Sequence, residues 1–547
     1  MKERSPEMAD FGEILRAAGD YGRFQKRLLA GLLLPTMILP MHFYSVMFTH
    51  AGSAHHCNTD WILRASPNLS TQEQLNLTLP RDQDGSFKSC EMFTPVDWDI
   101  ESIREYGINL TTRCSDGWVY DTSVYKSSIV SDFDLVCEKA NFVGMAQSVF
   151  MGGILLGSFI FGPLAESFGR KRAVQIPVVL MLIASVGSAL SPNFYVYLAT
   201  QFIVGTSYGG YRVNYIILAT EWIGVAQRTY PSALCAMLGG VGQTALAGVA
   251  YFIRDWRSVQ YVIASPWALF ILYIWIIPES ARWLLDRGKT EEAEKLILMV
   301  AAVNKKQIPD NIMEKVVNNK KGENRGTVKD LITSPLLRKY FFTVLFAWFS
   351  LNVGYYSITL NVGKFGMDIF LTQLIFGLTE IPAQIVCAWL MEALGRKITV
   401  ASVLLLGGFI SLLLLAVPQD SAITITALAT AGRLFMNMGG TTFSVYVQEL
   451  FPTYIRQTAN GIAAMVTRVA GMLSPVLNML AVYHSAIPVL VYSGLAVASG
   501  SFCFLLPETR RKELPDSTED LEESRVMQMK RSNPVDDAHL SERATKL

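Results

Sequence analysis

The sequence predicts an all-α membrane protein of about twelve transmembrane helices, arranged as two pseudo-symmetric six-helix halves. Three observations support this fold class. The 547 residues are 51% hydrophobic and only 17% charged, whereas an average soluble chain has roughly 25% charged residues. Apolar runs of about 18–25 residues recur, and each is long enough to cross a hydrocarbon core of about 30 Å as a helix. Several landmark residues also repeat between the two halves of the chain.

The charge balance argues against a nucleic acid as the binding partner. The 47 basic and 46 acidic residues leave a formal net charge of +1. This charge gives no long-range field to attract a polyanion, so we expect no nucleic-acid partner. The mean hydropathy of +0.30 fits a membrane protein better than a large soluble enzyme. The apolar runs lack the alternation of an outer-membrane barrel, so the expected spans are helices.

The apolar runs place six spans in each half of the chain. In the first half they cover 28–49, 142–164, 173–190, 195–219, 230–252 and 259–277. In the second half they cover 340–360, 370–391, 399–417, 422–446, 458–482 and 486–506. The residues before the first span are polar and charged and show no cleavable signal, so we expect the first span to insert uncleaved.

Basic residues predict the orientation of these spans in the membrane. Basic clusters occur at 23–27, 170–172, 396–397 and 510–512, and the positive-inside rule places them in the cytosol. The expected order is a cytosolic N-terminus (1–27), an N-terminal half (28–278), a cytosolic central loop (279–338), a C-terminal half (339–507) and a charged, disordered cytosolic tail (508–547).

The segment 50–140 is expected to lie outside the cell, between the first two spans. It contains all three N-x-S/T glycosylation motifs, at Asn68, Asn76 and Asn109. Four of the seven cysteines are also in it, namely Cys57, Cys90, Cys114 and Cys137. In an oxidising compartment they predict two disulfides, with three possible connectivities. The remaining cysteines, Cys235, Cys387 and Cys503, lie in apolar spans and are typical of packing residues.

Three landmarks recur at an offset of about 226 to 229 residues, which indicates a duplicated six-helix unit. A Gly-Arg-Lys sequence follows the second span of each half, at 169–171 and 395–397. A Glu and an Arg seven positions apart follow the fourth span. A Pro-Glu pair ends the sixth span, at 278–279 and 507–508. Duplicated helical halves are the architecture of alternating-access transporters.

These landmarks resemble the signature of the major facilitator superfamily. The pattern G-x-x-x-[D/E]-x-x-G-R-[K/R] is matched at 162–171 and echoed at 392–397, where Ala388 replaces the first glycine. The cysteine-bearing loop and the motifs at 278–284, 449–458 and 506–510 make nearly the whole chain similar to the organic-ion transporters of solute carrier family 22. Within that family it resembles the organic anion branch, nearest the subgroup that handles nicotinate and urate.

Charged residues at the cytosolic helix ends are the expected gate. They are Glu166, Arg170, Lys171, Glu221 and Arg228 in the first half, and Glu392, Arg396, Glu449 and Arg456 in the second. We expect opposite charges to bridge the halves when this gate closes and to separate when it opens. One exposed ion pair contributes only about 0–1 kcal/mol, so a network has to bias the two states. The alternative is that the basic residues only set the topology.

Arg468 is the strongest candidate for substrate binding. A charge at mid-membrane costs about 3 kcal/mol on insertion scales and usually lines a cavity or has a partner. Arg468 lies well inside a span, without an acidic residue within four positions. A guanidinium can hold a carboxylate with two hydrogen bonds. The resemblance implies the same role, since anion carriers have Arg and cation carriers Asp at this position. The alternative is a pair with a distant acid such as Glu380, or snorkelling.

Two further polar residues bear on the substrate. Arg212 has no Arg counterpart in the family pattern, and it either lines the cavity or pairs with a carboxylate elsewhere in the bundle. Gln384 stands where the anion branch often has Lys or Arg. A neutral side chain there favours a monoanion, or a ligand that also needs amide hydrogen bonds. That Arg212 restores the missing charge is a hypothesis.

Aromatic residues are expected to complete the site. Trp348, Tyr355 and Tyr356 share one face of their span, and the resemblance implies that this face lines the cavity. Phe443 and Tyr446 are three positions apart and face the same way. Flat rings and Tyr hydroxyls suit a planar aromatic acid; ordinary helix packing is the alternative for both sets. His42, the lone mid-span histidine, is more typical of packing or hydrogen bonding than of proton coupling.

The sequence contains neither a Walker A motif nor a metal-spaced His/Cys cluster or nucleophile triad, so we expect no ATP motor, cofactor, metal or enzyme activity. The expected function is alternating-access transport of small organic anions, such as monocarboxylates or urate-like compounds, across the plasma membrane, by uniport or by exchange against a counter-anion. Alternatives are a carrier of zwitterions, of uncharged vitamins such as riboflavin, or of organic cations. An anion channel is the rival from another class.

Overall fold

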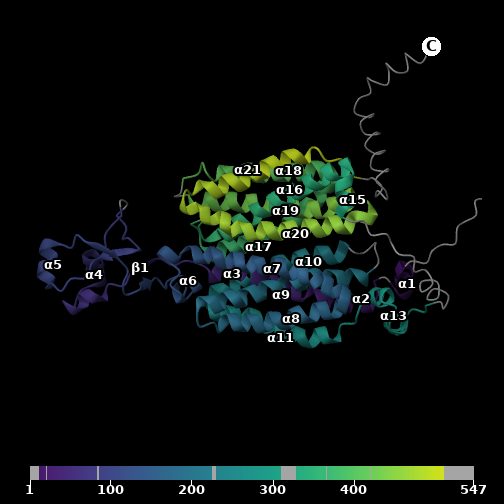
Figure 1. Ribbon diagram of the computed structural model, residues 1–547, viewed down its shortest axis with the longest axis horizontal. Coiled ribbons are helices and arrows are strands. Elements are labelled where there is room, and N and C mark those ends of the chain that lie inside the picture. The colour runs from purple at the N-terminus through teal and green to yellow at the C-terminus, as the bar shows by residue number, and fades with distance from the viewer. Residues whose placement is uncertain are drawn as a thin grey trace, which may run out of the picture.

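The computed structural model describes residues 11–19, 21–82, 85–223, 229–308, 328–364, 366–418 and 421–510. Two helical bundles lie side by side along their length (Figure 1). The first bundle, the N half, consists of α2 (Arg23–Leu33), α3 (Pro35–Thr49), α7 (Asn141–Phe168), α8 (Arg170–Ala189), α9 (Phe194–Glu221), α10 (Thr229–Ile253) and α11 (Trp256–Ile276). The second, the C half, consists of α16 (Pro335–Leu360), α17 (Ile369–Leu394), α18 (Arg396–Leu413), α19 (Ala422–Leu450), α20 (Thr453–Met479) and α21 (Ala486–Cys503).

Nine helical segments of the described chain are long and apolar enough to cross a membrane. The helices α9 and α19, with 28 and 29 residues, are also long enough to cross a membrane. They are not among these nine segments because they are less apolar. Both have a charged residue well inside the helix, Arg212 or Arg433, which lowers their hydropathy. The helix bounds agree with the expected spans to within about a turn and a half. Helices such as α16 begin before the apolar window because backbone hydrogen bonding continues where the side chains turn polar.

Residues 50–140 form a small unit, here called the loop domain, between α3 and α7. Its elements are β1 (His55–Cys57), α4 (Thr71–Thr78), β2 (Glu91–Phe93), α5 (Ile100–Tyr106), β3 (Thr111–Arg113), β4 (Trp118–Tyr120) and α6 (Ile129–Asp132). The strand β1 pairs antiparallel with β4, and β2 with β3. Disulfides join Cys57 to Cys114 and Cys90 to Cys137, which selects one of the three possible connectivities. The loop domain projects from one end of the bundles (Figure 1), called the loop-domain end.

Short helices lie at the opposite end, called the linker end (Figure 1). They are α1 (Phe11–Ala18), α12 (Ala281–Asp286), α13 (Thr290–Asn304) and α15 (Val328–Thr333). Asn304 attaches α13 to the start of the chain: its amide nitrogen donates to the carbonyl of Ala18 at 2.9 Å, and its oxygen accepts from the Phe24 N–H at 2.9 Å. Residues 309–327 of the expected central loop and 511–547 of the expected disordered tail lie outside the described residues.

The duplicated landmarks build the same structure in both halves. Gly169 and Gly395 have φ of +105° and +91°, backbone conformations that residues other than glycine rarely adopt. Each glycine makes the turn into the next helix. The carboxylate of Glu279 accepts from the Lys171 N–H at 3.0 Å, and that of Glu508 accepts from the Arg396 N–H at 2.9 Å. A carboxylate at a helix N-terminus complements the helix dipole. The repeat therefore preserves a glycine turn and its acidic cap.

The two halves contact each other through α7 with α20 and α10 with α17. Gly377 of α17 lies directly against Thr244 of α10, where a Cβ would meet the Thr244 hydroxyl at 2.4 Å. Small residues allow such close approach of helices. Nearer the loop domain, Phe48 of α3 stacks on Phe370 of α17 with ring centroids 5.5 Å apart. These contacts run from the middle of the bundles to the loop-domain end.

Candidate functional site

Four charged residues of the described helices lie more than two turns from either helix end. They are Arg212 on α9, Glu380 on α17, Arg433 on α19 and Arg468 on α20. Charges in the interior of a membrane bundle mark substrate pathways or paired sites. The site is therefore built around these four side chains.

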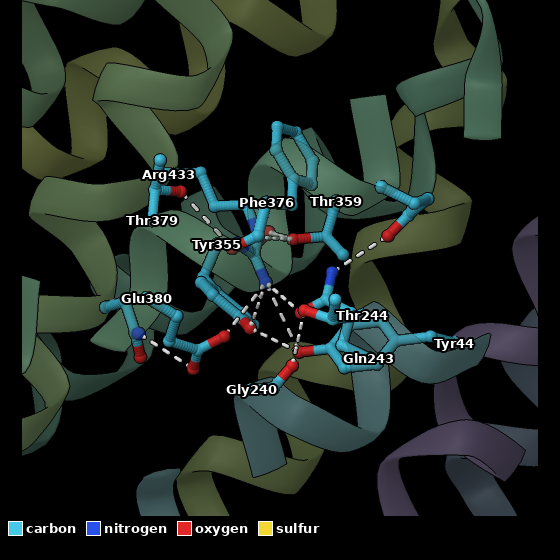
Figure 2. Close-up of polar contacts among 12 residues, drawn as sticks. Tyr44, Gly240, Gln243, Thr244, Tyr355, Thr359, Phe376, Thr379, Glu380 and Arg433 are labelled. Atoms are coloured by element: carbon cyan, nitrogen blue, oxygen red, sulfur yellow. Dashed lines mark hydrogen bonds and ion pairs between the residues drawn. The ribbon is translucent and has the colours of Figure 1, made fainter. Parts of the chain in front are cut away.

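Arg433 is fully buried and forms the centre of a polar network (Figure 2). Its Nη2 donates to the hydroxyl of Tyr355 at 3.0 Å, to Oε1 of Gln243 at 3.2 Å and to the hydroxyl of Tyr44 at 3.3 Å. Tyr44 and Tyr355 also share a hydrogen bond of 2.7 Å between their hydroxyls. Since Tyr44 and Gln243 belong to the N half, this network joins the two halves.

Other partners of Arg433 belong to the C half. Its Nε donates to Thr359 Oγ1 at 3.2 Å, and its Nη1 donates to the carbonyl of Phe376 at 3.3 Å. The carboxylate of Glu380 lies 3.6 Å from Nη2, and its other oxygen accepts from Asn437 at 2.9 Å. Glu380 therefore compensates Arg433. The suggestion that Glu380 pairs with Arg468 receives no support.

Arg212 of the N half and Arg468 of the C half lie near each other. The guanidinium of Arg468 is within hydrogen-bond reach of the Tyr356 hydroxyl and close enough to Arg212 for the two charges to interact. Arg212 donates to the hydroxyl of Tyr208 at 3.3 Å and also lies near Tyr356. The side chain of Arg212 is exposed and that of Arg468 is half-buried. Both cations are therefore at least partly accessible.

The charges in the middle of the bundle do not balance. Within the described part of the chain, three cations and one anion occupy these positions, and Glu380 compensates Arg433. Neither Arg212 nor Arg468 has a carboxylate partner among the described residues. Two partly accessible guanidinium groups, paired with tyrosine hydroxyls but with no carboxylate in the described part of the chain, form a site that a bound anion would stabilise.

The structure separates the predicted aromatic residues into two groups. Tyr356 lies at Arg468 and Tyr355 at Arg433, so both adjoin the charged site. Phe443 and Tyr446 are fully buried, and the Tyr446 hydroxyl donates to the carbonyl of Pro507. They pack within the C half, as the packing alternative expected.

Two other predicted residues lie at the edge of the site. Trp348 is half-buried and packs on Phe443, with ring centroids 5.6 Å apart. Gln384 is half-buried and accepts a hydrogen bond of 2.7 Å from Thr441. The structure thus brings Arg468, Arg212 and Tyr356 near one another, while Trp348 and Gln384 contact other residues.

The ion pairs seen at the linker end lie within one half each. Arg170 pairs with Glu221 at 3.2 Å. Arg396 pairs with Glu449 at 3.1 Å and with Glu392 at 3.3 Å. In this conformation these pairs tie the ends of neighbouring helices within each repeat. Bridges between the halves were expected for the closed gate alone, so that expectation stays a prediction.

The remaining gate residues make local contacts. Lys171 Nζ donates to the carbonyl of Trp275 at 3.0 Å. The Glu166 carbonyl accepts from Trp283 Nε1 at 2.8 Å. Arg456 donates to the carbonyl of Phe451 at 3.2 Å. Arg228 lies outside the described residues.

Other predicted residues have the surroundings that their proposed roles need. Asn68, Asn76 and Asn109 are exposed on the loop domain. The buried His42 accepts a hydrogen bond of 2.8 Å from Trp267 Nε1, in keeping with a hydrogen-bonding role. Cys387 and Cys503 are buried, whereas Cys235 is partly exposed and its sulfur lies 2.7 Å from the Tyr215 hydroxyl.

Sequence reasoning missed Arg433, although the criterion that identified Arg468 applies to it equally. Arg433 also lies well inside a span, without an acid within four positions. Its partners Tyr44 and Gln243 gave no such signal, because uncharged polar residues are common in membrane spans. Only the fold brings them to Arg433.

Known proteins similar to this chain are membrane transporters. Residues 113–521 match the family described as "Sugar (and other) transporter". The chain is 37% identical over 517 residues to solute carrier family 22 member 13 of Homo sapiens, with 94% of each chain covered. It is 34% identical over 527 residues to solute carrier family 22 member 7 of Rattus norvegicus, covering 94% of this chain and 98% of that one.

Solved structures give the same fold. The chain is similar to the partially occluded inward open conformation of the xylose transporter XylE from E. coli, with a TM-score of 0.56 and 18% identity, over 88% of this chain and 99% of that one. It is also similar to the inward open conformation of XylE, with a TM-score of 0.56 and 17% identity, over 92% and 98% of the two chains. At this identity the likeness shows the fold alone.

Proposed function

Because the chain belongs to solute carrier family 22 of the major facilitator superfamily, we propose that it carries small organic anions across the plasma membrane. The chain is a membrane transporter of this family and not an enzyme. The proposed substrates are monocarboxylates and urate-like anions, and the proposed mechanism is alternating access of the two halves.

One observation carries the proposed substrate class: Arg212 and Arg468 lie near each other, and neither has a carboxylate partner among the described residues. A guanidinium recognises a carboxylate with two parallel hydrogen bonds. An anion between the two arginines would therefore contact both halves at once. The hydroxyl and ring of Tyr356 favour a planar acid beside them. Gln384 stands where the organic anion branch often has a Lys or Arg. In this proposal Arg212 supplies the positive charge that is missing at that position.

The proposed orientation places the loop domain outside the cell, both chain ends in the cytosol and twelve spans between them. The exposed Asn68, Asn76 and Asn109 and the two disulfides support an oxidising surrounding for the loop domain. The halves contact each other toward the loop-domain end, and Arg212 is exposed. Both features support a conformation that opens to the cytosol.

The two arginines also favour exchange over uniport. Two like charges that lie near each other in a protein interior repel more strongly than they would in water. Closing the empty carrier would exclude water from Arg212 and Arg468 and leave their repulsion without an anion to compensate it. The loaded carrier therefore changes conformation more readily than the empty one. In the proposed cycle, the carrier binds a second organic anion on the opposite side of the membrane before it changes back.

The test is uptake of labelled nicotinate, urate, a dicarboxylate, a quaternary ammonium compound and riboflavin. Wild type is expected to take up one or both monoanions, Arg468→Lys to retain part of that uptake and Arg468→Asp to lose it, at equal surface level. Preloaded anion is expected to stimulate uptake, which a channel does not show. If wild type carries only the quaternary ammonium or riboflavin, the anion proposal is wrong.

A further inference from the structure

We propose that Arg433 locks the gate at the loop-domain end by exchanging hydrogen-bond partners between the two halves. In the conformation seen here the guanidinium holds oxygens of the N half. When the loop-domain end opens, Glu380 replaces them. This inference depends on the membrane orientation proposed above, with the loop domain outside the cell. It does not depend on the proposed substrate being an anion.

The first observation is that Nη2 of Arg433 has more acceptors than hydrogens. Three oxygens lie within hydrogen-bond distance, those of Tyr355, Gln243 and Tyr44, and a fourth, of Glu380, lies at 3.6 Å. A terminal guanidinium nitrogen has two hydrogens. The four acceptors therefore compete for this nitrogen, and one can replace another while the buried charge stays compensated.

The second observation is that the competing acceptors belong to different halves. Tyr44 lies on α3 and Gln243 on α10, both in the N half, whereas Glu380 lies on α17 in the C half with Arg433. In Figure 2, Tyr44 and Gln243 lie to one side of the guanidinium and Glu380 to the other. When the halves separate at the loop-domain end, the N-half acceptors leave with their helices. Glu380 stays with Arg433.

Glu380 is already held in position for this exchange. Its Oε1 accepts from Asn437 at 2.9 Å, and Asn437 follows Arg433 by one turn on the same helix. Charge-assisted hydrogen bonds between N–H and carboxylate are about 2.7–2.9 Å long. A movement of about 1 Å thus completes the Arg433–Glu380 bond once the competing acceptors have left.

The lock also adjoins the anion site. Tyr355 contacts both Arg433 and Tyr44 through its hydroxyl. The next residue on α16, Tyr356, reaches Arg468. A shift of α16 that accompanies opening therefore moves a residue of the lock and a residue of the anion site together.

The test measures opening of the gate without substrate, so its result does not depend on the proposed anion. A cysteine replaces Thr244, which lies in the closed contact with Gly377, in a Cys235→Ser background. A membrane-impermeant maleimide is added on the side of the loop domain, and the labelling rate reports the open fraction. Gln243→Ala and Tyr44→Phe are each expected to raise this rate about tenfold. Glu380→Gln, which keeps an acceptor oxygen but removes the negative charge that compensates Arg433 in the open state, is expected to lower it about tenfold.

Thr359→Val is the matched control. Thr359 accepts from the same guanidinium at 3.2 Å but lies on α16, in the same half as Arg433. Its bond persists in both states, so the labelling rate should stay within about twofold of the parent. Variants that do not reach the cell surface are labelled as purified protein in nanodiscs. The lock is overturned if Gln243→Ala and Glu380→Gln move the rate in the same direction, if neither moves it, or if Thr359→Val moves it as far as Gln243→Ala.

Discussion

The guanidinium of Arg433 lies 3.6 Å from the carboxylate of Glu380, so the only acid among the four mid-helix charges is already compensated. This relationship defines the electrostatics of the bundle. It leaves Arg212 and Arg468 as two positive charges at the boundary between the halves. The near-neutral charge of the whole chain hides this excess, because acidic residues of the loops and helix ends cancel it in the total.

The buried pair predicts a non-additive effect on stability. Arg433→Gln leaves the largely buried Glu380, whose side chain is 16% exposed, without its cation. Breaking a buried pair from one side costs about 3–5 kcal/mol. The double variant Arg433→Gln with Glu380→Gln removes both charges, so it should recover about 1–3 kcal/mol of that loss. Thermal unfolding of the purified protein measures both. A double variant that is less stable than Arg433→Gln contradicts the pairing.

Cys235 offers a native probe of the anion site. It is partly exposed and lies near Arg212, whereas Cys387 and Cys503 are buried. We expect maleimide added to inside-out vesicles to label Cys235, and a transported anion at ten times its Kd to slow the labelling about tenfold by mass action. Cys235→Ser is the control that identifies the labelled residue. Labelling that is equally fast with and without anion would place the anion away from Cys235.

The duplicated glycine turns predict that a Gly→Ala substitution, which adds one methyl group, lowers the stability of the protein at the turn. Gly395 has φ of +91°, and a Cβ there would lie 2.6 Å from the Glu508 carboxylate that caps α18. Gly395→Ala should therefore destabilise the protein by about 1–3 kcal/mol. At Gly162 a Cβ meets nothing within 4 Å, so Gly162→Ala should be neutral or slightly stabilising. Melting temperatures compare the two, and equal values would argue against the strained turn.

The three sequons predict the side of the membrane on which the loop domain lies. Asn68, Asn76 and Asn109 are exposed and at least one should bear a glycan if the loop domain is extracellular. Replacing all three by Gln should abolish the gel shift that glycosidase treatment produces in wild type. A wild-type protein without any glycosidase shift, expressed in cells that glycosylate other membrane proteins, would count against the proposed orientation.

The helices were largely predictable from the sequence because a membrane span leaves a long apolar run. The repeat was predictable because each landmark has a local role: Gly169 makes the turn and Glu279 caps the next helix. How the halves contact each other was not predictable. The contact of Gly377 with Thr244 joins residues more than a hundred positions apart, and hydropathy carries no information on such distances.

The candidate site was predictable in part. Burial cost alone identified Arg468, and the same argument would have identified Arg433. Helical spacing correctly placed Phe443 and Tyr446 on one face, but spacing does not tell which face lines a cavity, and both are buried in packing. Charge sign alone suggested bridges between the halves for the closed gate at the linker end, but it did not predict how these charges pair in the conformation seen here. The structure pairs those charges within each half, as in Arg170 with Glu221.

The central claim is that an organic anion binds between Arg212 and Arg468. The most direct test is the affinity of the purified protein for an anion that it transports, measured by titration calorimetry in wild type, Arg212→Gln, Arg468→Gln and the double variant. A hydrogen bond between charged groups contributes about 1.5–3 kcal/mol. Each single variant should therefore bind about 10- to 100-fold more weakly, and the double variant should show no measurable binding. Wild-type affinity in the double variant would contradict the account.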